Sequence, residues 1–282
     1  MNSSIFHGTM VDMTYIEIEN LIKQDAVVLL PVAVIEEHGP HLPLGTDTYL
    51  AYSMCKHVQV ELEYANVKSV IAPPFYWGIN VATSGFPGSF TVKVDTMKAV
   101  LKDTIECVYS WGFNNVYILN LHGDYLHSKT IVDTVKEIYE LSSENKKVYN
   151  IIPEFFKTRL GLDGSEPYVL IQKDEEEQSS NDDLNTVENP YLDIHAGGLE
   201  TSLMLLEFKE LVNEKMAREL ESSKTTFELL SKWQKGGFEG REVTPFGYCG
   251  NPSNIDLNEA NRFVDCFAKS SANLIINSIK PL

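Results

Sequence analysis

The sequence has few cysteines, and none lies close to another along the chain. Its 282 residues contain four, and no CxxC pair occurs. Such wide separation argues against a thiolate zinc site and against a disulfide framework. We therefore expect all four to be small buried side chains of a protein in the reducing cytoplasm: Cys55, Cys107, Cys249 and Cys266.

Positive charge is also scarce. The chain has 23 Lys and Arg against 40 Asp and Glu, a net charge of −17, and no basic stripe. Nucleic acid and anionic membrane surfaces would be repelled, so we expect neither as a partner. The amino terminus lacks the pattern of a secretory leader, and no apolar run is long enough to span a bilayer. No internal repeat is visible.

Strand-like and helix-like segments alternate through the first half of the chain. Repeated strand-then-helix units are typical of a parallel sheet covered by helices on both faces, so we expect an α/β fold. We find no convincing domain boundary, and we expect one domain over residues 1–282. Short apolar runs predict strands at 26–35, 67–75, 114–121 and 146–154, and helical spacing predicts helices at 48–64, 95–112, 128–144 and 256–280.

An acidic segment interrupts this pattern at residues 174–190, "DEEEQSSNDDLNTVENP". It is almost free of hydrophobic residues, which is typical of a solvated loop. It also leads directly into "YLDIHAGGLETSLML", a segment whose histidine and glutamate could take part in catalysis or ligand binding. The segment is therefore either a solvated loop or a mobile lid.

Reactive side chains follow two of the predicted strands. Glu36 and His38 come after 26–35, and His122 and Asp124 come after 114–121. In an extended segment, i, i+2 spacing sends both side chains to the same side, and sites in open parallel sheets lie at the carboxyl ends of the strands. If the two strands are neighbours, these four side chains form one cluster. Asp47, at the start of the next helix, can add a third carboxylate.

Such a cluster is typical of a metal centre. Each residue alone is most often a surface charge, a helix cap or a hydrogen-bonded histidine, but carboxylates held together repel one another unless a cation compensates them. Two histidines and three carboxylates suit a pair of divalent ions, Zn, Mn or Fe(II), with one carboxylate bridging.

A third feature is "HAGGLETSLML" at 195–205. His195 precedes two glycines, which let the backbone approach another group closely. Glu200 opens an apolar helix. It is either a first-turn carboxylate favoured by the helix dipole or a group that orients a ligand or His195.

These segments resemble the motifs of the creatininase (creatinine amidohydrolase) family. The resemblance rests on "PVAVIEEHGPHLPLGTD", "FPGS", "NLHGD" and "HAGGLETS", in that order, and covers roughly residues 15–275. It implies a three-layer α/β/α fold with a mainly parallel central sheet, a two-metal site, hydrolysis of a C–N amide-type bond, and often a hexamer.

The resemblance also implies a role for each site residue. Glu36 and His38 would each bind one metal, with His122 on the metal of Glu36. Asp47 would bridge the two metals, and Asp124 would bind the metal of His38. His195 would contact substrate and move protons. All five ligand positions hold a competent ligand.

The chain departs from the family around the substrate. Gly123 stands where creatinine-cleaving members have an aromatic residue, and 80–85 reads "NVATSG" where many relatives carry a His or Glu before Phe-Pro-Gly. Gly198 replaces a frequent glutamate. We expect an intact metal centre and a rebuilt pocket, with creatinine a poor substrate.

The sequence therefore predicts a metal-dependent amidohydrolase. A water acidified by the metals would attack the amide carbon, and His195 would protonate the leaving nitrogen. Candidate substrates are a formamide, a small linear or cyclic amide, and a peptide bond in a small modified peptide. The alternatives are a non-catalytic metal-binding oligomeric scaffold and, last, a nucleotide-binding domain, which would need a glycine-rich phosphate loop that the sequence lacks.

Overall fold

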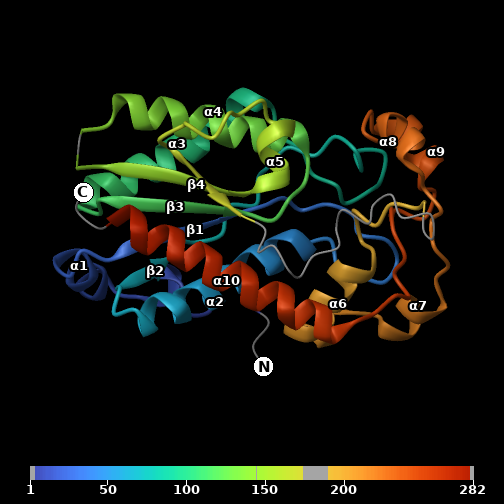
Figure 1. Cartoon of the computed structure of the whole chain (residues 1–282), viewed down its shortest axis with the longest axis horizontal. Coiled ribbons are helices and arrows are strands. Elements are labelled where there is room, and N and C mark those ends of the chain that lie inside the picture. Colours follow the sequence, from blue (N-terminus) through green and yellow to red (C-terminus); the bar gives the residue numbers. More distant parts are fainter. Residues whose placement is uncertain (1–3, 144, 174–189, 280–282) are drawn as a thin grey trace.

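Five parallel strands form the central sheet of the protein (Figure 1). The computed structural model describes residues 4–143, 145–173 and 190–279. The strand order is β2-β1-β3-β4-β5, and every neighbouring pair is parallel. The strands are β1 (Val27–Val32), β2 (Ser69–Ile71), β3 (Asn115–Asn120), β4 (Lys147–Pro153) and β5 (Val169–Gln172).

The four strands predicted from the sequence are confirmed, with shorter bounds. β2 keeps only three residues of the predicted 67–75, and Pro73 and Pro74 follow shortly after its end. The edge strand β5 has no counterpart among the predictions. It has four residues, two of them only partly buried, so it lacks the long apolar run that identifies a buried strand.

Helices cover both faces of the sheet, which confirms the three-layer α/β/α fold (Figure 1). On one face, α3 and α4 pack on alternate residues of the strands. On the other face lie α2 and α10, which contact each other extensively. The helices are α1 (Tyr15–Lys23), α2 (Thr46–Tyr64), α3 (Val94–Trp111), α4 (Tyr125–Leu141), α5 (Glu154–Arg159), α6 (Gly198–Glu207), α7 (Glu214–Glu219), α8 (Phe227–Trp233), α9 (Gly237–Val243) and α10 (Leu257–Ile279), with short 3₁₀ turns at Met10–Asp12 and Lys209–Leu211.

The position of the candidate site follows from the strand order. β1 and β3 are neighbours, and the register aligns Val32 with Asn120 near their carboxyl ends. The segments that carry Glu36, His38 and His122 therefore leave the sheet at the same edge. The condition for the predicted cluster, that these two strands are neighbours, is met.

The expectation that all four cysteines are buried is confirmed for two of them. Cys55 and Cys249 are buried as predicted, whereas Cys107 and Cys266 are exposed because they lie on the outer sides of α3 and α10. The acidic segment 174–190 lies, apart from Pro190, outside the described residues. Within the described ranges, no helix is long and apolar enough to cross a membrane.

Candidate metal centre

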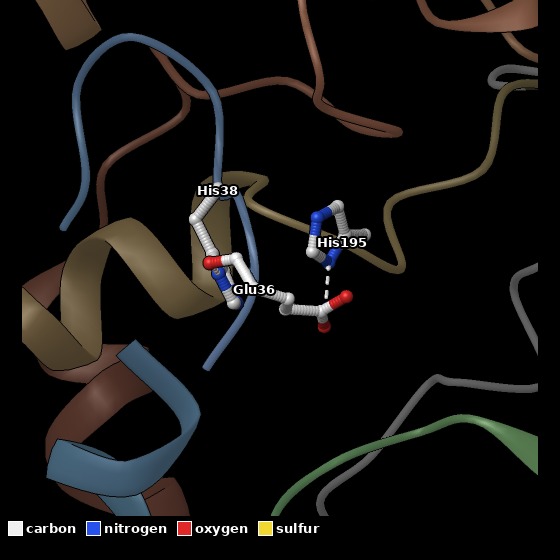
Figure 2. Close-up of side chains that lie close together, drawn as sticks. All are labelled: Glu36, His38 and His195. Carbon is white, nitrogen blue, oxygen red and sulfur yellow. Dashed lines mark hydrogen bonds and ion pairs between the residues drawn. The ribbon is translucent and has the colours of Figure 1, made fainter. Parts of the chain in front are cut away.

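The structure brings five of the predicted site residues together. Glu36 and His38 follow β1, His122 follows β3, and Asp47 is the second residue of α2. The fifth, His195, precedes α6 and lies against Glu36 and His38 (Figure 2). All five are at most 6% exposed. Acids and imidazoles from four separate segments thus form one buried cluster.

His122 presents one ring nitrogen to two carboxylates. Its Nε2 lies 3.1 Å from the Ile79 carbonyl oxygen, and because a carbonyl only accepts, Nε2 carries the proton. The opposite nitrogen, Nδ1, lies 2.9 Å from Asp47 Oδ2 and 3.1 Å from Glu36 Oε1. In the neutral ring, the lone pair of Nδ1 therefore faces two carboxylate oxygens.

His38 repeats this arrangement with different partners. Its Nδ1 donates to the Glu36 backbone carbonyl at 3.1 Å. Its Nε2 lies 3.1 Å from Asp47 Oδ1 and 3.9 Å from Glu200 Oε2. A histidine with one N–H fixed by a backbone carbonyl and the other nitrogen turned to carboxylates is oriented as a metal ligand is.

The Asp47 carboxylate lies between the two histidines, with one oxygen toward each. Oδ2 is buried and makes no well-aligned hydrogen bond despite its short distance to His122. A divalent ion on each side of this carboxylate would satisfy both oxygens and both ring nitrogens. The donor set therefore fits divalent metal: Glu36, Asp47 and His122 form one potential ligand group, and His38, Asp47 and Glu200 form another.

Charge within the cluster is balanced only while the histidines are protonated. Burial lowers the pKa of His38, but the carboxylates of Asp47, Glu200 and Glu36 outweigh it and raise the pKa to about 10. Burial likewise opposes the charge on Asp47, yet the two histidines hold its pKa well below the usual range. The protein thus maintains positive charge where divalent ions would supply it.

Asp124 is the one predicted ligand that the structure places elsewhere. Its Oδ1 accepts from the His127 N–H at 3.0 Å and caps α4, and its Oδ2 accepts from the Val81 N–H at 3.0 Å. Among the described residues, the groups able to hold a metal do not include it. The backbone of Asp124 is itself extended, but α4 begins at the next residue and the carboxylate accepts from the N–H groups of that helix and of Val81. Its role as a ligand stays a prediction.

Glu200 lies inside the cluster and not merely beside it. It is in the first turn of α6, accepts from the Ala196 N–H at 2.5 Å, and shares a potential metal group with His38 and Asp47. Burial raises its pKa. Ala196 has a left-handed φ of 50°, which is strained for alanine and turns the chain between His195 and Glu200.

His195 faces the cluster with its Nδ1. Its Nε2 donates to the Glu37 carbonyl at 2.9 Å, and Nδ1 lies 3.8 Å from Glu36 Oε1 (Figure 2). Its ring centroid lies 4.5 Å from that of His38. This position is open to two roles, proton donor and ligand, because Glu36, His38 and His195 also form a potential metal group.

The two glycines after His195 lie very close to other protein groups. A Cβ at Gly197 would lie 1.5 Å from Asp193 Oδ1, and one at Gly198 would lie 2.5 Å from the Asn254 carbonyl oxygen. Asp193 accepts from the Gly198 N–H and so caps the start of α6. The glycine pair therefore fixes the turn that presents His195.

Sequence reasoning missed three side chains at the site. Thr83 donates to Glu36 Oε2 at 2.6 Å, and its position in the altered segment 80–85 was an available signal. Glu37 is buried, with Oε1 3.5 Å from His195 Nε2. Trp233, from the end of α8, lies 5.9 Å from His195 between ring centroids, and nothing in its local sequence indicates this contact.

Comparison with known proteins gives a family and several relatives. The model of the creatininase family, described as creatinine amidohydrolase, matches residues 11–275. The 3-dehydro-scyllo-inosose hydrolase of Thermotoga maritima is 26% identical over 212 residues, 74% of this chain and 59% of that protein. The mycofactocin precursor peptide peptidase of Mycolicibacterium smegmatis is 34% identical over 98 residues, 34% of this chain and 39% of that protein. The chain thus spans less than two thirds of the length of either relative.

A third relative and two solved structures match over more of their length. The creatinine amidohydrolase of Pseudomonas putida is 25% identical over 224 residues, 76% of this chain and 75% of that protein. A structure named "Creatininase Mn" superposes with a TM-score of 0.69 at 18% identity, covering 97% of this chain and 99% of the other. A creatinine amidohydrolase (creatininase) structure gives 0.67 at 19%, covering 98% and 99%. At these identities the structural matches show a shared fold.

Proposed function

The chain belongs to the creatininase family, and on that premise we propose that it is an amidohydrolase that uses two divalent metal ions to cleave a C–N amide-type bond. The observation that carries this proposal is the Asp47 carboxylate, buried between His38 and His122, whose opposite ring nitrogens both donate to backbone carbonyls. Zn, Mn and Fe(II) all accept such a mixed set of nitrogen and oxygen ligands.

We assign Glu36, Asp47 and His122 to one ion, and His38, Asp47 and Glu200 to the other. Each set brings its ligand atoms within 4.8 Å of one another. Glu200 here takes the position that the family resemblance gives to Asp124, because Asp124 is committed to two backbone N–H groups. When bound, such ions would acidify a water molecule and polarise the carbonyl oxygen of the amide.

The chain's own residues supply orientation and a proton. Thr83 holds the Glu36 carboxylate, and Ala196 N–H holds that of Glu200. The Glu37 carbonyl fixes the Nε2–H of His195, so the opposite nitrogen, Nδ1, is the one that can deliver a proton toward the cluster. We assign His195 as the donor to the leaving nitrogen, a task suited to imidazole near neutral pH.

Elemental analysis together with an amide screen tests the proposal. We expect about two divalent ions per chain and turnover of at least one small amide or formamide when Mn or Zn is supplied. Asp47→Ala should lose both ions, because the same carboxylate serves both. Full metal loading of Asp47→Ala would refute the bridging assignment. Two bound ions without turnover on any amide would instead favour a non-catalytic metal-binding scaffold.

A peptidase is the second candidate function. It is favoured by the 34% identity to the mycofactocin precursor peptide peptidase. Cleavage of short peptides in preference to formamides and simple amides, measured in the same screen, would select it.

Assembly and location extend the proposal. We propose a homo-oligomer, a hexamer by resemblance to the family, in the cytoplasm. Light scattering coupled to gel filtration measures the mass of the assembly, and fractionation of the source cells tests the cytoplasmic location. A monomeric mass would refute the assembly.

A further inference from the structure

Gly123 leaves an opening beside the candidate metal ligand His122. Its backbone is outside the left-handed region, and a Cβ built there would meet nothing within 4 Å. Neither the backbone conformation nor the packing therefore requires a glycine at this position. Gly123 is itself exposed, so glycine leaves solvent-accessible space at the residue that follows His122 in the chain.

Arg159 borders this opening. It is the last residue of α5, which directly follows β4, and its Nη1 donates to the Gly123 carbonyl at 3.1 Å. The guanidinium also packs over the ring of Phe156, with 5.5 Å from Cζ to the ring centroid. Two contacts hold the cation in place, and Arg159 remains exposed. In the described ranges its one hydrogen-bond acceptor is Gly123, so other N–H groups of the fork are available to a ligand.

One carboxylate lies near Arg159: Asp124 raises the pKa of the guanidinium, although burial lowers it more. Both Asp124 oxygens already accept from backbone N–H groups, so this carboxylate does not take up the free N–H groups of Arg159. Arginine stays protonated at all physiological pH values and pairs with carboxylates through a planar fork. In the proposed centre, two divalent ions would outweigh the three carboxylates of Glu36, Asp47 and Glu200 by one positive charge. The centre would then not repel an anion held at its rim, even though the chain as a whole carries −17.

We propose that Arg159 binds a carboxylate of the substrate, so that the amide cleaved belongs to an N-acyl amino acid or to the carboxy-terminal residue of a short peptide. This inference rests on the proposed function. Gly123 provides the space through which such a group reaches the guanidinium. An aromatic side chain at position 123 would occupy that space.

Arg241 provides a matched control. It lies in α9, its Nη1 donates to the Gly85 carbonyl at 3.3 Å, and its Cζ lies 4.8 Å from the centroid of the Phe86 ring. Like Arg159, it therefore makes one hydrogen bond to a glycine carbonyl and one contact with a phenylalanine ring. It differs in contacting the 80–89 segment and not Gly123.

The test compares N-formylglycine with its neutral analogue N-formylglycinamide, using formate release so that only the formyl C–N bond is scored. The wild-type protein with its metals should prefer N-formylglycine in kcat/KM by at least about 10-fold. Arg159→Met should raise KM for N-formylglycine by about 10- to 100-fold, the usual effect of losing a hydrogen bond to a charged group, and change N-formylglycinamide less than about 2-fold. Arg159→Lys should restore part of the preference, and Arg241→Met should keep it.

An unchanged preference in Arg159→Met, or no preference in the wild type, would overturn the inference. If the wild type releases formate from neither compound, calorimetric titration of N-formylglycine into the purified proteins decides. Binding that Arg159→Met loses would support the carboxylate site while the proposed hydrolysis fails. Equal binding by both proteins, or none by the wild type, would overturn the inference.

Discussion

The assignment of Glu200, in place of Asp124, as a metal ligand can be tested by two substitutions. One should lose an ion, and the other should keep both ions but lose stability. In Glu200→Gln, the amide oxygen can still accept from the Ala196 N–H, so the turn before α6 should persist. The substitution removes the negative charge 3.9 Å from His38 Nε2. Losing a contact outside the ligand set already costs about 10- to 100-fold in metal affinity, so losing a ligand should cost more than about 100-fold. One of two ions should be lost.

Asp124→Ala should keep both ions and lose stability. It removes the cap of α4, worth about 1 kcal/mol, and the acceptor of the Val81 N–H, worth about another 1 kcal/mol. A loss of about 2 kcal/mol corresponds to roughly 3–4 °C in Tm for a chain of this size.

Both variants are measured by elemental analysis after dialysis and by thermal denaturation. Asp124→Asn is the matched control, since its side-chain oxygen can still cap α4. The reasoning is refuted if Asp124→Ala loses one ion at unchanged Tm while Glu200→Gln keeps two.

Three further predictions follow from other contacts. His195→Ala should keep both ions and lose about 10²- to 10⁴-fold in kcat, with a smaller loss on amides that have good leaving groups; loss of an ion would make His195 a ligand. Creatinine should be hydrolysed weakly, because Gly123 supplies no aromatic ring, and efficient creatinine turnover in a direct assay would contradict this. The hydrogen bond to Glu207 raises the pKa of His57, so this pair stabilises the protein fully below the unfolded pKa of about 6.5 and less as pH rises through the folded value. His57→Gln should therefore destabilise the protein more at pH 6 than at pH 9. The difference in free energy of unfolding should be under about 1 kcal/mol because the pair is partly exposed, and an equal loss at both pH values would contradict the assignment.

The sequence by itself determined the alternation of the elements and most of the cluster. The apolar runs of β1 and β3 are long enough to identify, and in a parallel sheet their carboxyl ends meet at one edge. Glu36, His38 and His122 could therefore be predicted to meet on the condition that β1 and β3 are neighbours, because each lies within a few residues of a strand end. The structure supplied that condition.

Only the tertiary structure decided what surrounds that core of ligands. The Asp124 carboxylate accepts from two N–H groups, one of them from Val81, which is distant in sequence. Three side chains near Glu36 come from segments about 50 to 200 residues away in the sequence: Thr83, Glu200 and Trp233. Their positions depend on how α6, α8 and the 80–89 loop pack. Local spacing carries no information about such contacts, since the physical cause is the burial of whole elements against one another and not the pattern within any one of them.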